Sequence, residues 1–149
     1  MTNINSLKTL VVSLNTIIIN NNISLHHTIP YISSYCGNDW KHTVVDINKR
    51  SYVKHLIYGN CFYELFLISW NDTSSKWHSH PANGCVMKVL SGNLHEYTHF
   101  NGIINYRMLN ENNIGFKRCD ALHNIISNGI NHSLHLYSPV GYRLKKYLT

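Results

Sequence analysis

A chain of 149 residues, of which 44% are hydrophobic, is long enough for a single domain with a proper core. Its net charge of +6 could serve nucleic-acid binding, but the basic residues are scattered. Their longest cluster is Arg143, Lys145 and Lys146, so we expect no nucleic-acid partner. The four cysteines show no C-x-x-C spacing, which argues against a disulfide framework.

Residues 1–45 are expected to form a helical segment that packs on the main body of the domain, which spans residues 1–149. Apolar residues recur at helical spacing over residues 5–19, although Ile17-Ile18-Ile19 would suit a strand equally well. A second short helix is expected over residues 28–35. The apolar runs near the N-terminus are too short and polar for a membrane span, and they lack the basic start of a signal peptide. We therefore expect a cytoplasmic protein without membrane contact.

From about residue 50 to residue 140 the pattern is typical of strands. Short apolar or alternating runs are separated by turn pairs such as Gly59-Asn60, Asn101-Gly102 and Asn128-Gly129. Many short strands with turns between them predict a closed sandwich or barrel, so the fold class is mainly β. The expected strands span residues 51–58, 61–70, 86–90, 93–100, 103–108, 113–117, 121–127 and 131–137.

His78 and His80 are separated by one residue. Because alternate side chains of an extended strand point the same way, they would present two imidazoles on one face. Imidazole is the commonest side-chain ligand for mid-row divalent metals. By itself such a pair could also arise by chance or lie on the exposed surface, but His123 supplies a further candidate ligand.

A second feature is the alternating segment from Ser133 to Tyr137. Ser133, His135 and Tyr137 share one face of a strand, while Leu134 and Leu136 share the other. Leucines on the core side are ordinary. Three polar side chains on the opposite face require either water or a polar cavity.

The order of these residues resembles cysteine dioxygenase, a thiol dioxygenase of the cupin superfamily. The first cupin motif has two histidines, a glutamate after four residues and a glycine after six more. His78-x-His80, Cys85 and Gly92 fit this spacing, with cysteine in the glutamate place, a substitution characteristic of cysteine dioxygenase. The resemblance covers roughly residues 35–140. It implies a cupin fold, which is a double-stranded β-helix or small jelly-roll barrel with a metal site inside its mouth.

The resemblance implies that His78, His80 and His123 bind one Fe(2+) ion. Three neutral imidazoles can occupy one face of an octahedral ion and leave three positions open. Zinc also accepts three histidines, so the ligand set does not choose between the two metals. The choice of iron rests on the resemblance.

The resemblance also implies a thioether crosslink between Cys85 and Tyr137. The Tyr137 hydroxyl would lie near the open metal positions, while His135 and Ser133 would hold the phenol in place. The simpler interpretations are that Cys85 is a small buried hydrophobe and that Tyr137 is an aromatic residue of the barrel wall.

The expected substrate anchor departs from the family pattern. Cysteine dioxygenases bind the substrate carboxylate with an arginine two residues after a tyrosine, and the matching residues here are Tyr52 and Lys54. Lysine attracts a carboxylate as a point charge without the bidentate fork of arginine. Arg50 would share a face with both residues if the strand begins that early. The chain ends soon after Pro139, where the family usually continues, so we expect a more open barrel mouth.

The expected function is an iron-dependent thiol dioxygenase that oxidises L-cysteine with O₂ to cysteine sulfinic acid, acting as a monomer. One alternative is a dioxygenase for another small thiol such as 3-mercaptopropionate. The other is a metal-binding cupin without catalysis. Oxygen uptake by iron-loaded protein would distinguish these hypotheses.

Overall fold

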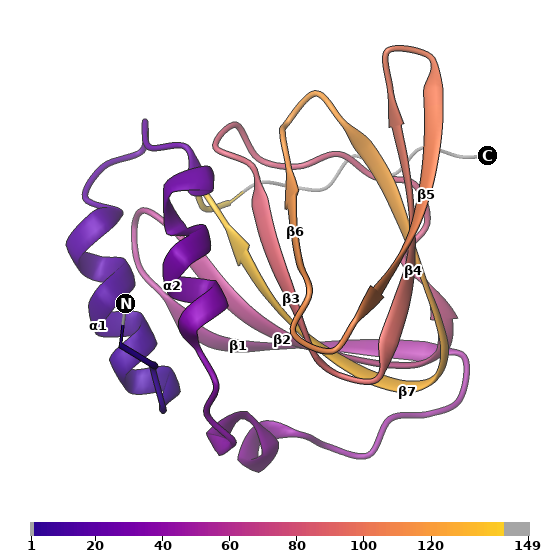
Figure 1. Cartoon of the computed structure of the whole chain (residues 1–149), viewed down its shortest axis with the longest axis horizontal. Coiled ribbons are helices and arrows are strands. Elements are labelled where there is room, and N and C mark those ends of the chain that lie inside the picture. The colour runs from indigo at the N-terminus through magenta and orange to yellow at the C-terminus, as the bar shows by residue number, and fades with distance from the viewer. Residues whose placement is uncertain (1, 142–149) are drawn as a thin grey trace.

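The structure, a computed structural model, describes residues 2–141 of the chain. Antiparallel strands form one curled sheet, and helices pack against one side of it, so the expected mainly β fold with N-terminal helices is confirmed (Figure 1). The basic cluster at residues 143–146 lies outside the described residues. In chain order the elements are α1 (Leu7–Ile17), the 3-10 helix η1 (Leu25–Thr28), α2 (Ile29–Ser34), the 3-10 helix η2 (Asp39–Thr43), β1 (Ser51–Gly59), β2 (Glu64–Ser74), β3 (Cys85–Ser91), β4 (Asn93–Phe100), β5 (Ile103–Asn110), β6 (Ile114–Lys117) and β7 (Leu122–Tyr137).

Helix α1 forms where apolar spacing predicts it, over a shorter range than expected. Ser6 caps its N-terminus, because Ser6 Oγ accepts a hydrogen bond from a backbone N–H of the first turn at 3.1 Å. Leu10 and Leu14 are fully buried on its inner face. Ile18 has left the helical conformation and caps the C-terminus, with its backbone N–H donating to the carbonyl oxygen of Leu14, so the helix ends inside the β-branched run.

Strand β7 is the centre of the sheet. One of its edges pairs with β2, from Glu64 opposite Tyr137 to Ser74 opposite Ile126. Its other edge is shared, because β4 pairs with the first part of β7 and β3 with the second part. Strands β1, β5 and β6 extend the sheet from β2, β4 and β3 respectively. Side chains from β2, β3, β4 and β7 therefore line the same barrel interior.

The prediction of two strands joined by a turn at Asn128-Gly129 was wrong, because β7 runs through both without a break. At this point the register with β2 shifts, which leaves a bulge opposite Asp72. Gly129 has a φ of 74°, and its backbone N–H donates to the Asp72 carboxylate. Gly129 forms part of a bulge and not of a chain reversal, because β2 is long enough to pair with β7 on both sides of this glycine.

The other two turn pairs behave differently from each other. Asn101 and Gly102 both have positive φ and join β4 to β5 in a two-residue hairpin, as predicted. Gly59, in contrast, is the last residue of β1, and β2 begins only at Glu64. The connection between them is held by Asn60, whose side-chain oxygen accepts two backbone N–H groups of the loop.

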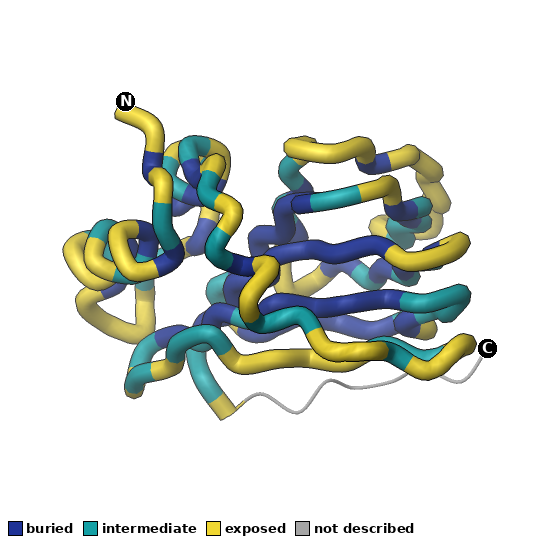
Figure 2. The backbone as a smooth tube through the Cα atoms, turned by 90° about the horizontal axis from the view of Figure 1, so that it is seen from below, coloured by how far each residue is buried: buried dark blue, intermediate teal, exposed yellow. Residues whose placement is uncertain are grey.

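Both faces of the sheet carry an apolar layer, and strand β3 shows how they alternate. Val86 faces the helices, whereas Met87 faces the barrel interior. Lys88 also faces the helices and is buried, with its ammonium group donating to the carbonyl oxygens of Ser33 and Tyr35 at the end of α2. Figure 2 shows the resulting pattern of buried central strands and exposed outer segments.

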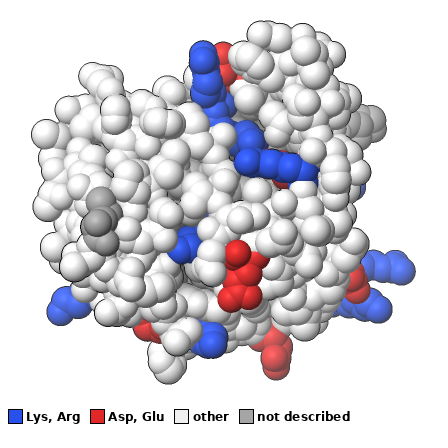
Figure 3. Space-filling view, viewed as in Figure 1, with Lys and Arg blue, Asp and Glu red and all other residues white. Residues whose placement is uncertain are grey.

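Charged side chains are sparse on the surface, as the charged fraction of 13% leads one to expect. On the face seen in Figure 3, several Lys and Arg side chains gather along one groove, and most of the remaining surface is uncharged. Within residues 2–141, no helix is long and apolar enough to cross a membrane.

Candidate metal centre

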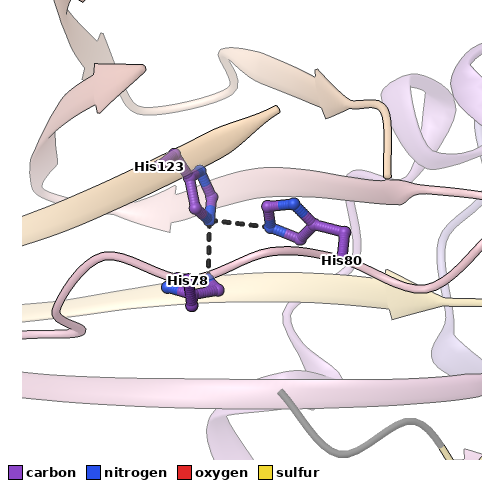
Figure 4. Close-up of side chains that lie close together, drawn as sticks. All are labelled: His78, His80 and His123. Carbon is purple, nitrogen blue, oxygen red and sulfur yellow. Dashed lines mark hydrogen bonds between the residues drawn. The ribbon is translucent and has the colours of Figure 1, made fainter. Parts of the chain in front are cut away.

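Three buried histidines meet inside the barrel, and they are the three that the sequence singled out. His78 and His80 come from the segment between β2 and β3, whereas His123 comes from the start of β7 (Figure 4). His123 Nε2 lies 2.9 Å from His78 Nε2 and 3.0 Å from His80 Nε2. All three donor nitrogens lie within 4.8 Å of one another.

The expectation that His78 and His80 lie in a regular strand was wrong. Only His78 makes a bridge, in which its backbone N–H and carbonyl pair with those of His123 at 3.0 and 3.1 Å. Lys76 has a φ of 65°, which ends the extended conformation of β2 before the motif. The two rings nevertheless point toward the same place because the backbone bridge holds this segment against β7.

Hydrogen bonds on the far sides of the rings decide where the protons lie. The carbonyl oxygen of Lys76 can only accept, so His78 Nδ1, at 2.9 Å, must be the donor. The ionised carboxylate of Glu96 likewise accepts from His123 Nδ1 at 2.9 Å. In neutral rings this leaves both Nε2 atoms unprotonated, with their lone pairs facing each other. Such an arrangement is favourable only when a cation lies between them.

The spacing also fits one metal ion. Two nitrogens that each bind an ion at about 2.1 Å, with their bonds at right angles, are about 3.0 Å apart. The observed separations from His123 Nε2 are 2.9 and 3.0 Å. Burial lowers the pKa of His123, and it lowers the pKa of His80 well below its usual range, so both are neutral and able to bind a cation. The residues present therefore fit a divalent metal.

Glu96 of β4 is the part of this centre that sequence reasoning missed. Its side chain is fully buried and also accepts from Arg107 Nε at 2.6 Å and pairs with Lys117 Nζ at 3.1 Å. Burial alone would raise the pKa of Glu96, but the hydrogen bond from His123 and these two cations lower it to about 2. The available signal was the alternation with Leu94, which places both residues on the inward face of β4.

Cys85 and Tyr137 lie directly opposite each other in the β3–β7 pair, and both are buried. Their side chains share a hydrogen-bonding contact. Burial raises the pKa of the Cys85 thiol to about 12, so the sulfur is protonated at neutral pH. Burial raises the pKa of Tyr137 as well. Among the described residues the group that could bind a metal consists of the three histidines and does not include Cys85.

A chain of hydrogen bonds runs along the polar face of β7, as its alternation predicted. Trp70 Nε1 donates to Ser133 Oγ at 2.9 Å. Ser133 Oγ and His135 Nε2 are 2.7 Å apart, and His135 Nδ1 lies 3.2 Å from the Tyr137 hydroxyl. Burial lowers the pKa of His135 well below its usual range, so this imidazole is neutral. The Tyr137 hydroxyl is therefore held by a hydrogen-bond chain formed by residues of its own strand.

A small pocket of about 30 Å³ opens beside the histidines. The Lys54 residue as a whole is exposed to solvent. Its ammonium group, however, lies 4.5 Å from the ring centre of Phe66 and 4.9 Å from that of Tyr137. Burial lowers the pKa of Lys54. Arg50 lies before β1 and does not line the pocket. The lining residues are Tyr52, Lys54, Ile68, Trp70, Ser75, His78, His123, Ile125, His135 and Tyr137.

Comparisons with known proteins agree with this geometry. The model of the family cysteine dioxygenase type I matches residues 1–148. No curated protein matches the chain.

Among solved structures, a cupin superfamily protein from Desulfitobacterium hafniense DCB-2 has a TM-score of 0.55 at 12% identity, over 64% of this chain and 84% of that one. A cupin-2 domain protein from Shewanella frigidimarina NCIMB 400 has a TM-score of 0.53 at 16% identity, over 68% and 91%. A third structure, of Fe(II) HppE in complex with substrate, has a TM-score of 0.51 at 15% identity, over 64% and 58%. These structures show that the barrel is a cupin fold. By its family match, this chain belongs to the cysteine dioxygenase type I family of cupin thiol dioxygenases.

Proposed function

We propose that this chain is an iron-dependent thiol dioxygenase that converts L-cysteine and O₂ to cysteine sulfinic acid, with His78, His80 and His123 as the metal ligands. The observation that carries the proposal is the set of three buried imidazoles, whose Nε2 atoms converge beside a small pocket. The family match supports the reaction class, and the Fe(II) complex among its structural relatives supports iron in this fold.

The reaction needs no reductant besides the substrate. Both oxygen atoms of O₂ are transferred to the thiolate sulfur, which loses four electrons while O₂ gains four. A ferrous ion bound by the histidines supplies the redox chemistry that lets O₂ react with a thiolate. The pocket is small, which favours a small thiol over a large substrate.

The protein's own residues orient the substrate in this proposal. Lys54 would attract the substrate carboxylate, because its ammonium group already lies over two aromatic rings at the pocket. Tyr52, which packs on Trp70 with ring centres 5.1 Å apart, forms the wall next to it.

Tyr137 would donate a hydrogen bond from its hydroxyl to the substrate or to O₂. Its phenol is positioned by His135, which is in turn hydrogen-bonded to Ser133. The raised pKa of Tyr137 keeps its proton available for donation at neutral pH.

We further propose that Cys85 and Tyr137 become linked by a thioether between the sulfur and the ring carbon beside the phenol oxygen. Forming this bond breaks the S–H bond and one ring C–H bond, and the two protons and two electrons released reduce O₂ to hydrogen peroxide. The direct pairing of the two residues across β3 and β7 supports the proposal. The link would remove rotamer freedom from the phenol.

A second candidate substrate is 3-mercaptopropionate, which has the thiol and carboxylate of cysteine without the amine. One observation favours it, because no Asp or Glu is among the described residues that line the pocket. A cation such as Lys54 can attract the carboxylate of either thiol, while the described lining of the pocket offers no carboxylate to attract an ammonium group.

Oxygen uptake by iron-loaded protein with cysteine, and separately with 3-mercaptopropionate, tests these proposals. Stoichiometric formation of cysteine sulfinic acid with O₂ is the expected result. Faster uptake with 3-mercaptopropionate would instead assign the second substrate. An iron-loaded protein that consumes no oxygen with either thiol would contradict the dioxygenase proposal and leave a metal-binding cupin.

A further inference from the structure

Glu96 is the only buried acidic side chain among residues 2–141. A buried carboxylate is costly unless its oxygens are fully paired. Here Oε1 accepts from His123 Nδ1 at 2.9 Å and lies 3.1 Å from Lys117 Nζ, while Oε2 accepts from Arg107 Nε at 2.6 Å. Both oxygens of Glu96 are thus fixed in position.

The partners of Glu96 come from different strands, so the group is held as a unit. Arg107 is on β5, Lys117 is on β6 and His123 is on β7. Gly115 of β6 provides the space for the guanidinium group, because a Cβ there would lie 2.9 Å from Arg107 Nη2. This packing leaves the carboxylate little freedom to move away from the imidazole.

The alternative tautomer of His123 would defeat metal binding. With the proton on Nε2, the ring would donate to His78 Nε2, which is unprotonated and only 2.9 Å away. Two histidines would then satisfy each other and leave fewer lone pairs for a cation. A carboxylate at Nδ1 excludes this outcome, because it can only accept.

We propose that Glu96 is a positioning residue that keeps the proton of His123 on Nδ1 and so turns the Nε2 lone pair toward the other two imidazoles. The inference rests on the proposed metal site, but it does not depend on which thiol is the substrate. Arg107 and Lys117 hold the carboxylate in place for this role.

The tautomer can be measured directly in the wild-type protein without metal. Long-range ¹⁵N–¹H correlation NMR at neutral pH distinguishes a proton on Nδ1 from one on Nε2. The expected result is His123 protonated on Nδ1. Protonation on Nε2 would overturn the proposal, and this measurement needs no variant to fold.

The effect on affinity is measured with Co(II) alone, followed by its visible absorption. Glu96→Gln should weaken Co(II) binding about ten- to a hundredfold, as is typical when the partner of a metal-binding histidine is lost. Glu111→Gln, which removes one exposed carboxylate outside this network, should leave it unchanged. Wild-type affinity in Glu96→Gln would overturn the inference.

A third variant separates this inference from the proposed function. His123→Ala should lose most Co(II) binding. If it binds Co(II) as well as the wild type does, the proposed metal site itself is wrong. If His123→Ala loses the metal while Glu96→Gln keeps it, only the role of Glu96 is wrong.

Discussion

Cys85 lies directly opposite Tyr137 in the β3–β7 pair, and both side chains are buried. Directly opposite residues of antiparallel strands have Cβ atoms about 4.5–5.5 Å apart. Neither strand has to shift for the sulfur to reach the phenol ring. A crosslink between these residues would therefore preserve the fold and reduce only side-chain motion.

The first prediction concerns this crosslink. After incubation with iron, cysteine and air, part of the protein should be lighter by the mass of two hydrogen atoms, and reduction should not reverse the change. Intact mass and peptide mapping should locate the loss at Cys85 and Tyr137. Cys61→Ser, which changes an exposed cysteine, should still form the product. Turnover without any Cys85–Tyr137 peptide would contradict the prediction.

The second prediction concerns the metal ligands. Changing His78, His80 or His123 to alanine should remove most bound iron, because each supplies one of the converging nitrogens. Metal analysis of the purified variants, with circular dichroism as a check on folding, measures the effect. His27→Ala alters an exposed histidine and should retain full iron. Full iron in all three site variants would place the metal elsewhere.

The third prediction concerns the substrate anchor. Lys54→Met should raise KM for cysteine about ten- to a hundredfold, because a charge-assisted contact to a carboxylate is worth about 1.5–3 kcal/mol. Lys54→Arg should retain or improve the use of cysteine, since arginine can bind a carboxylate in a bidentate manner. Steady-state oxygen uptake gives the constants.

The control for the anchor is Arg50→Met. Arg50 lies before β1 and outside the pocket lining, so its loss should not change KM. An unchanged KM in Lys54→Met together with a raised KM in Arg50→Met would assign the carboxylate to Arg50.

The fourth prediction concerns pH and the metal-free protein. Burial lowers the pKa of His80, His123 and His135 below the value of 6.5 for an unperturbed histidine. Below pH 6.5 the unfolded chain therefore binds more protons than the folded protein, and stability falls as pH falls. Each histidine contributes a slope of at most about 1.4 kcal/mol per pH unit, approached as the pH falls below 6.5.

Urea unfolding of metal-free protein at pH 7.5, 6.5 and 5.5 tests the fourth prediction. The unfolding free energy should change little between the two higher values and fall steeply between the two lower ones. His135→Gln should reduce the slope of the unfolding free energy against pH by the contribution of about one proton, whereas His27→Gln should leave this slope unchanged. Equal stability at pH 6.5 and 5.5 would show that the buried histidines do not remain neutral.

Much of the candidate site could be predicted from the sequence because its signals are local. Spacing alone put Ser133, His135 and Tyr137 on one face of a strand, and the structure shows them joined by hydrogen bonds. The resemblance to cysteine dioxygenase grouped His78, His80 and His123, which the structure places around one point. The alternation from Ser133 to Tyr137 could be predicted because the side-chain period of a strand does not depend on the rest of the fold.

Other features were decided only by the tertiary structure. Asn128-Gly129 has the composition of a turn, but β2 pairs on both sides of it, so the chain continues as one strand with a bulge. Alternation with Leu94 can place Glu96 on the inward face of its strand, but the sequence does not show that cations from β5 and β6 and an imidazole from β7 converge on it. These partners become neighbours only when the sheet curls closed. The protonation of His123 follows from that closure, because the acceptor at its Nδ1 lies 27 residues away in the chain.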